Sequence, residues 1–153
     1  MLLQKIQLYV QAAGKIPVMC TSTNLAALAF ENCLTAHSTF GYPVLEDHDV
    51  NDAVEQVQCK PTPERLELLL NCSLIIWDEF LQNHHDVLDA AVELVKANKQ
   101  LIIITGADGR QCPPVVPFGT AKETILASMQ SSRHWPLFKV SIFLLPHVLT
   151  YHF

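Results

Sequence analysis

The stretch Leu74-Ile75-Ile76-Trp77-Asp78-Glu79-Phe80 decides the fold, because it places two adjacent carboxylates directly after an apolar run. A near-continuous apolar run is typical of a strand buried on both faces of a parallel sheet. Ligands of such sheets bind beyond the carboxyl ends of the strands, so we expect Asp78 and Glu79 at the mouth of a site. The pattern indicates a Walker B site, in which the first acid holds Mg²⁺ and the second polarises an attacking water. The alternative is a strand that ends in solvated charges.

A second apolar run, residues 100–105, ends in the polar turn Gly106-Ala107-Asp108-Gly109-Arg110-Gln111. We expect it to be a buried strand, parallel and adjacent to the first, with Gln111 at the same edge of the sheet as Asp78. In nucleotide motors the strand beside Walker B ends in a polar residue that senses the γ-phosphate, and Gln111 is placed for that role. An ordinary glycine turn with solvated side chains is the alternative.

The remaining chain alternates helical and strand patterns, which indicates an α/β fold with a parallel sheet flanked by helices. Thr62 is expected to cap a helix that has Pro63 at its first position. A loop is expected over residues 35–41. The acidic and polar stretch over residues 46–61 is expected to form a second loop at the surface. Further helices are predicted over residues 2–13, 25–31, 87–95 and 121–129, and further strands over residues 16–21 and from Lys139.

Four blocks of sequence then occur in one order: residues 35–40, residues 74–79, residues 108–117 and residues 127–140. Together they resemble successive motifs of the petite-integration-frequency type of superfamily 1B DNA helicases, especially the version found in Helitron transposons. The resemblance implies the first RecA-like motor lobe, a P-loop NTPase fold. It also implies ATP-dependent movement from 5′ to 3′ on single-stranded DNA, in repair, recombination, telomere maintenance or transposition.

The same resemblance assigns roles to individual residues. Asp78 would be the Mg²⁺ ligand, Glu79 the residue that activates water, and Gln111 the sensor of the γ-phosphate of ATP. Arg110 would make a supporting contact to the nucleotide. Three residues of one loop could contact DNA, through an imidazole, a hydroxyl and a ring that stacks on a base: His37, Ser38 and Phe40. The alternative is that this loop simply packs against the rest of the domain.

The chain departs from the family pattern at several positions. No Gly-Lys-Ser/Thr phosphate loop is present, and the single Gly14-Lys15 pair reads better as the end of a helix. Asn24 stands where relatives have glycine, and Gly109 stands where they have phenylalanine. We therefore expect residues 1–140 to be a partial motor lobe, inactive alone, and residues 141–153 to be a divergent tail. The alternative is a degenerate, non-enzymatic α/β domain that binds another protein.

The composition of the chain is typical of a domain that belongs to a larger assembly. Of 153 residues, 50% are hydrophobic and only 16% are charged, so a partner or a second lobe could cover an exposed apolar face. The net charge of −5 is unfavourable for an independent DNA-binding protein. Five cysteines without a Cys-x-x-Cys pair indicate a reducing compartment, and we expect an intracellular protein, nuclear or else mitochondrial.

The adjacent pair His84-His85 could suggest a metal site. We interpret it as a solvated helix start, since adjacent helical residues do not face one site.

Overall fold

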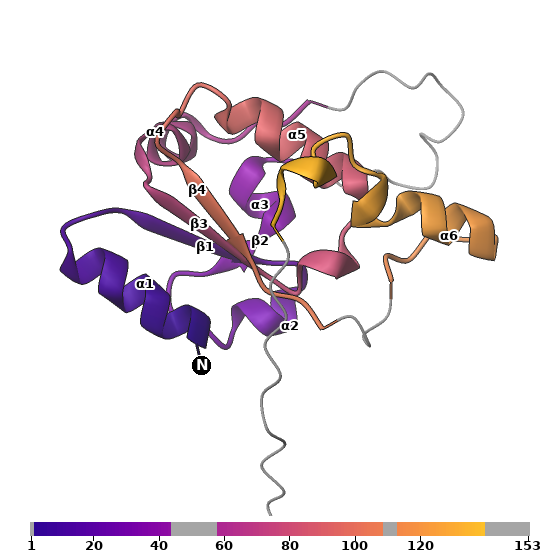
Figure 1. Cartoon of the computed structure of the whole chain (residues 1–153), viewed down its shortest axis with the longest axis horizontal. Helices are drawn as coiled ribbons and strands as arrows, with labels where there is room; N and C mark the ends of the chain where they lie inside the picture. Colours follow the sequence, from indigo (N-terminus) through magenta and orange to yellow (C-terminus); the bar gives the residue numbers. More distant parts are fainter. Residues whose placement is uncertain (1, 44–57, 109–112, 140–153) are drawn as a thin grey trace, which may run out of the picture.

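A parallel β-sheet lies at the centre of the computed structural model, which describes residues 2–43, 58–108 and 113–139 (Figure 1). Within these residues the sheet has four strands in the order β2-β1-β3-β4, and all of its pairs are parallel. The predicted α/β class is therefore confirmed. The strands are β1 (Pro17–Thr21), β2 (Leu34–Thr35), β3 (Leu74–Asp78) and β4 (Ile102–Thr105).

The register of the strands brings their carboxyl ends to one edge. Thr21 of β1 lies opposite Asp78 of β3, and Trp77 of β3 lies opposite Thr105 of β4. The prediction that the two apolar strands are adjacent and parallel is thus confirmed. Because the chain leaves all three strands at this edge, the residues that follow them can form a shared site.

Helices cover both faces of the sheet, as Figure 1 shows. Helix α1 (Leu2–Ala12) packs on one face, and α3 (Ala36–Phe40), α4 (Pro63–Asn71) and α5 (His85–Val95) pack on the other. The short helix α2 (Asn24–Ala27) follows β1, and α6 (Ala121–Ala127) precedes two single turns of 3₁₀ helix. In the part of the chain that the structure describes, no helix is long and apolar enough to cross a membrane.

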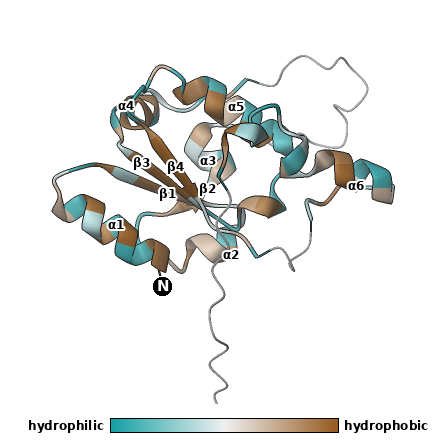
Figure 2. Ribbon diagram, viewed as in Figure 1, coloured by the Kyte–Doolittle hydropathy of each residue, from teal (hydrophilic) through white to brown (hydrophobic). Residues whose placement is uncertain are grey.

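Alternating side chains of the strands supply both cores. Ile75 and Trp77 point toward α3, α4 and α5, whereas Leu74 and Ile76 point toward α1. This period of two is the geometry of a strand. All four side chains are buried, so β3 is apolar on both faces, in agreement with the brown strands in Figure 2. The central position of β3 explains why its sequence is an unbroken apolar run.

Cap residues set the helix boundaries. Thr62 accepts a hydrogen bond from the backbone N–H of Arg65, and Pro63 occupies the first helical position, as predicted. Gly14 ends α1 with a left-handed φ of 71°, also as predicted. Thr35 likewise caps α3, and Gly41 ends that helix with φ 65°. The prediction of a loop over residues 35–41 is therefore wrong, because a capping threonine and a terminal glycine enclose a short helix there.

Two other predictions need correction. The helix expected over residues 25–31 is only the four-residue α2, which Thr23 caps. Strand β4 is less buried than predicted, since it lies at the edge of the described sheet and the side chain of Ile102 is 61% exposed. Lys139, where a strand was predicted to begin, is not in a strand, and the rest of that segment, the tail 141–153 and residues 46–57 of the predicted surface loop lie outside the described residues.

Candidate functional site

Asp78 ends β3 at the carboxyl edge of the sheet. Its Oδ1 atom accepts a hydrogen bond of 3.0 Å from the backbone N–H of Glu79. Gly106, just after β4, lies so close that a Cβ on it would be 2.7 Å from this oxygen. The backbone of Gly106 is itself fixed, because its N–H donates to the Trp77 carbonyl (2.8 Å) and its carbonyl accepts from the Phe80 N–H (3.0 Å). A side chain at position 106 would therefore force the carboxylate of Asp78 to shift.

Glu79 has a left-handed backbone, with φ 52° and ψ 28°. A non-glycine residue in this region carries strain, which the surrounding structure must hold in place. Two side-chain hydrogen bonds from the end of β1 do so. Ser22 Oγ donates to the Glu79 carbonyl (2.6 Å), and Thr23 Oγ1 donates to Glu79 Oε2 (2.9 Å). The second acid is thus turned toward the loop that follows β1.

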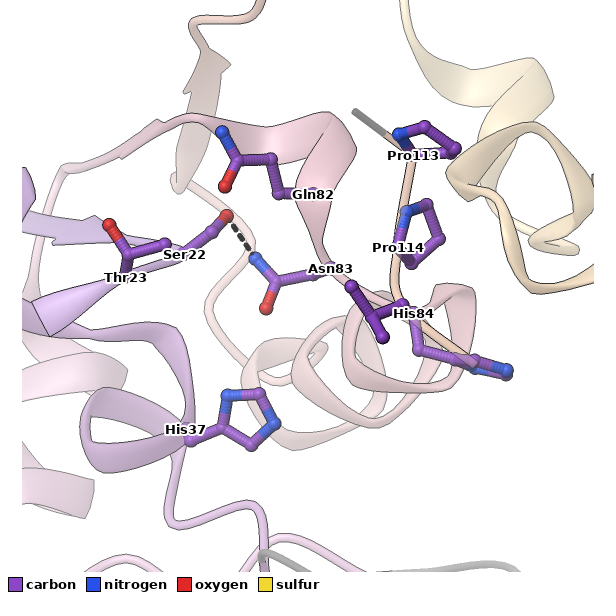
Figure 3. Close-up of a pocket in the computed structure, with 9 residues that line it drawn as sticks. Ser22, Thr23, His37, Gln82, Asn83, His84, Pro113 and Pro114 are labelled. Atoms are coloured by element: carbon purple, nitrogen blue, oxygen red, sulfur yellow. Dashed lines mark hydrogen bonds between the residues drawn. The ribbon is translucent and has the colours of Figure 1, made fainter. Parts of the chain in front are cut away.

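A pocket of about 380 Å³ opens beside these hydroxyl groups (Figure 3). Its polar side comes from the loop after β1, from α3 and from the segment after Glu79. Ser22 accepts a short hydrogen bond from the Asn83 amide, which is buried. The pocket is lined by Ser22, Thr23, His37, Gln82, Asn83, His84, Pro113, Pro114 and Val115.

The pocket has little charge. Burial lowers the pKa of His37 from its ordinary value of 6.5, so this imidazole is neutral at pH 7. Its ring lies edge-on to Tyr42, with 5.5 Å between the ring centroids. Burial also lowers the pKa of His84, against the opposing effect of Asp86. The lining therefore offers hydroxyl, amide and neutral imidazole groups together with an apolar wall of prolines.

The residues of the predicted DNA-binding loop have different surroundings. His37 lines the pocket, whereas Ser38 is exposed, does not line it and donates its backbone N–H to Thr35 Oγ1 (3.2 Å). Phe40 is only 1% exposed and packs on Trp77, with 5.2 Å between the ring centroids. The interpretation of Phe40 as a base-stacking residue is wrong, because the hydrophobic core covers its ring.

The remaining predicted site residues, Arg110 and Gln111, lie outside the described residues, so the placement of Gln111 with Asp78 stays a prediction. Sequence reasoning missed Ser22, Thr23 and Asn83. The first two directly follow β1, so the rule that identified Asp78 and Glu79 would have found them too. Asn83 carries no comparable signal.

The interpretation of His84-His85 as a helix start is confirmed, but the contact between the two side chains was not expected. His84 has an extended backbone and caps α5, so it is not the helical neighbour of His85. Their rings are in contact, with 4.6 Å between centroids and 34° between planes. The expectation that the two imidazoles do not face one site is therefore wrong.

Comparisons with known proteins agree with this architecture. The family model of the PIF1-like helicase matches residues 1–150. A Pif1 helicase structure with two copies coordinating at forked double-stranded DNA aligns with a TM-score of 0.60 at 23% identity, over 86% of this chain and 33% of that one. Pif1 from Candida albicans aligns with a TM-score of 0.60 at 19% identity, over 88% of this chain and 30% of that one.

Bacteroides Pif1 bound to single-stranded DNA aligns with a TM-score of 0.54 at 25% identity, over 81% of this chain and 29% of that one. The chain thus spans about a third of the length of these solved relatives. No curated protein sequence matches it. Because the family model covers nearly the whole sequence, the chain belongs to the PIF1-like helicase family.

Proposed function

We propose that this chain forms part of the first motor lobe of an ATP-dependent DNA helicase, where it joins a nucleotide site to a DNA site. Membership of the PIF1-like helicase family supports this assignment. The main observation in favour of the proposal is a direct contact between the pocket and Glu79 at the edge of the sheet. Thr23 lines the pocket and also donates a hydrogen bond to Glu79, so one side chain belongs to both regions.

The nucleotide side of the proposed site is the Asp78-Glu79 pair. Mg²⁺ prefers oxygen ligands, and the half-buried carboxylate of Asp78 at the strand end fits that preference. Gly106 leaves the space beside Asp78 Oδ1 that a side chain would fill. When bound, Mg²⁺ would neutralise phosphate charge. Glu79 would orient the attacking water and accept its proton, as the second acid of a Walker B pair does.

The DNA side of the proposed site is the pocket. Hydroxyl and amide side chains are common donors to phosphate and sugar oxygens, and Asn83 is the better donor here because the Ser22 hydroxyl already donates to the Glu79 carbonyl. The apolar wall formed by Pro113, Pro114 and Val115 suits the face of an unpaired base. A single strand is the ligand that these groups fit best, because only an unpaired base can place its face against the apolar wall.

The hydrogen bond between Thr23 and Glu79 suggests how the two sides communicate. A strand that engages the Thr23 hydroxyl competes with Glu79 for the same donor, because a hydroxyl has one proton to give. Release of the Glu79 carboxylate from this bond would let it turn toward a water. We therefore propose that Thr23 positions Glu79 according to whether the pocket is filled.

Fluorescence anisotropy with a labelled single-stranded oligothymidine and a duplex of equal length tests the DNA side. We expect the single strand to bind more tightly. We also expect His37→Ala to weaken its binding roughly fivefold, the equivalent of about 1 kcal/mol for one lost contact. His134→Ala is the matched control, because His134 does not line the pocket. Equal binding of wild type and His37→Ala would contradict the placement of DNA in this pocket.

The alternative, a non-enzymatic protein-binding domain, has one specific observation in its favour. Leu25 and Leu28 of the α2 region are 81% and 84% exposed. Such side chains can form the centre of a protein interface. The two proposals place the binding surface on different residues, the pocket in one case and the exposed leucines in the other. Leu25→Ser combined with Leu28→Ser should leave single-strand binding unchanged if the pocket binds DNA.

A further inference from the structure

Three metal-ligating side chains converge where helix α5 begins. His84 Nδ1 lies 3.1 Å from Asp86 Oδ2, and His85 Nδ1 lies 3.2 Å from Asp86 Oδ1. One ligand atom from each of the three residues can be chosen so that all lie within 4.8 Å of one another. This cluster plays no part in the nucleotide or DNA roles proposed for Asp78, Glu79 and the pocket residues His37 and Thr23.

Backbone geometry explains why adjacent residues reach one point. His84 is the N-cap, with φ −68° and ψ 143°, whereas His85 is already helical. The change from extended to helical backbone puts both imidazoles on the side of Asp86. The Nδ1 atom of His84 accepts a hydrogen bond of 3.3 Å from the Asp86 backbone N–H. Nδ1 therefore carries no proton, which is the tautomer that a metal ligand needs, and a metal ion would replace the Asp86 N–H as the partner of its lone pair.

His85 supplies the second, independent observation. Its Nδ1 atom is shielded from solvent and has no hydrogen-bond partner. The nearest charged groups around it are two carboxylates, Asp86 at 3.2 Å and Asp89 at 3.8 Å. A shielded polar atom without a partner is costly, and this one faces negative charge. A cation held between the imidazole and the carboxylates would satisfy all of these groups.

We propose that His84, His85 and Asp86 form a binding site for a divalent transition metal ion, with zinc as the best fit. Zinc binds imidazole nitrogen and carboxylate oxygen at about 2.0–2.2 Å in tetrahedral geometry, which puts neighbouring ligand atoms about 3.3 Å apart. The two nitrogen–oxygen separations, 3.1 and 3.2 Å, are close to that value but involve different oxygens of Asp86, so the carboxylate must turn for one oxygen to meet both nitrogens. The fourth position would be taken by water. Two imidazoles disfavour Mg²⁺, which takes oxygen ligands.

The site has a defined place in the fold. His84 is one of the residues that line the pocket, so a metal ion here would lie at the rim of the pocket. It would also tie the N-cap of α5 to the first turn of that helix. None of its ligands belongs to the Asp78-Glu79 pair, so the proposal does not rest on the nucleotide side of the proposed function, although His84 is shared with the pocket.

Isothermal titration of ZnCl₂ and MgCl₂ into the chelator-treated full chain tests the proposal. We expect one zinc ion per chain and no heat from Mg²⁺ at this site. His84→Asn should weaken zinc binding at least tenfold while preserving the fold, because asparagine is a good N-cap residue. Asp86→Asn should have a similar effect. His134→Ala is the control and should bind zinc like the wild type.

Cobalt substitution separates this site from binding by cysteine thiolates. The cobalt-loaded chain should show the visible absorption of a low-symmetry nitrogen and oxygen site, without a thiolate charge-transfer band. Loss of the visible absorption in His84→Asn would support the assignment. Equal zinc affinity in wild type, His84→Asn and Asp86→Asn would overturn it, and so would a thiolate band. No zinc binding to the wild type would also overturn it.

Discussion

Replacement of Gly106 by alanine tests the packing that holds Asp78 in place. A Cβ at this position would lie 2.7 Å from Asp78 Oδ1 and 2.9 Å from Leu3 Cδ1. The backbone of Gly106 cannot retreat easily, since hydrogen bonds to Trp77 and Phe80 fix it on both sides. The carboxylate of Asp78 must therefore move, and with it the hydrogen bond that it accepts from the Glu79 N–H.

The magnitude follows from two opposing effects. Gly106 does not have a positive φ. Alanine would therefore ordinarily stabilise the fold by about 0.4–1 kcal/mol, because it lowers the conformational entropy of the unfolded chain. Overpacking a fixed site costs about 1–3 kcal/mol. We expect a net loss of about 1–2 kcal/mol in the free energy of unfolding. This loss corresponds to a fall in Tm of roughly 2–8 °C for a chain of this size.

Urea denaturation followed by circular dichroism measures this loss, and a double-mutant cycle assigns it. In an Asp78→Ala background, Gly106→Ala should cost about 1 kcal/mol less, because the carboxylate that it meets is absent. Gly14→Ala is the matched control. Gly14 has φ 71° and open space around it, so its cost of about 1 kcal/mol comes from strain alone. That cost should be additive with Asp78→Ala. A neutral or stabilising Gly106→Ala, or the same cost in both backgrounds, would refute the packing argument.

Three further predictions follow from named contacts. Glu79→Gly should be about 1 kcal/mol more stable than Glu79→Ala, because only glycine relieves the left-handed φ of 52°; equal stabilities in urea would argue against strain. Phe40→Ala should cost about 3–5 kcal/mol in the same assay, as expected of a buried ring packed on Trp77, and a loss below 1 kcal/mol would place Phe40 outside the core. Burial lowers the pKa of His37 from 6.5 in the folded chain, so the unfolded chain binds the proton more readily; stability should fall as the pH drops from 6.5 toward the folded pKa, and His37→Gln should flatten that slope.

The sequence predicted the parts of the fold that local patterns determine. The apolar runs before Asp78 and Gly106 identified two strands and their shared edge, because buried parallel strands need apolar side chains on both faces. Thr62 and Pro63 identified the start of α4, because capping is a local interaction. Thr35 and Gly41 are the same kind of capping residues for α3. The prediction of a loop over residues 35–41 did not take them into account.

The candidate site was less predictable because it depends on contacts between distant segments. Ser22 and Thr23 meet Glu79 across 57 and 56 positions of sequence, and no local pattern indicates that contact. The left-handed backbone of Glu79 is likewise imposed by its surroundings. The wrong expectation for Phe40 has the same origin, since the motif alone does not show which side of α3 faces the core.

The central claim, that Asp78 and Glu79 form the metal–nucleotide site of a helicase motor lobe, is tested most directly by paramagnetic NMR. Mn²⁺ takes the same oxygen ligands as Mg²⁺ and broadens the signals of nearby nuclei even when its binding is weak. With Mn²⁺ and ADP added to the ¹⁵N-labelled His84→Asn chain, in which the second proposed metal site is disrupted, the amide signals of Asp78, Glu79 and Gly106 should broaden first. Asp78→Asn should abolish that broadening. Sharp signals at these three amides while others broaden, or unchanged broadening in Asp78→Asn, would contradict the claim.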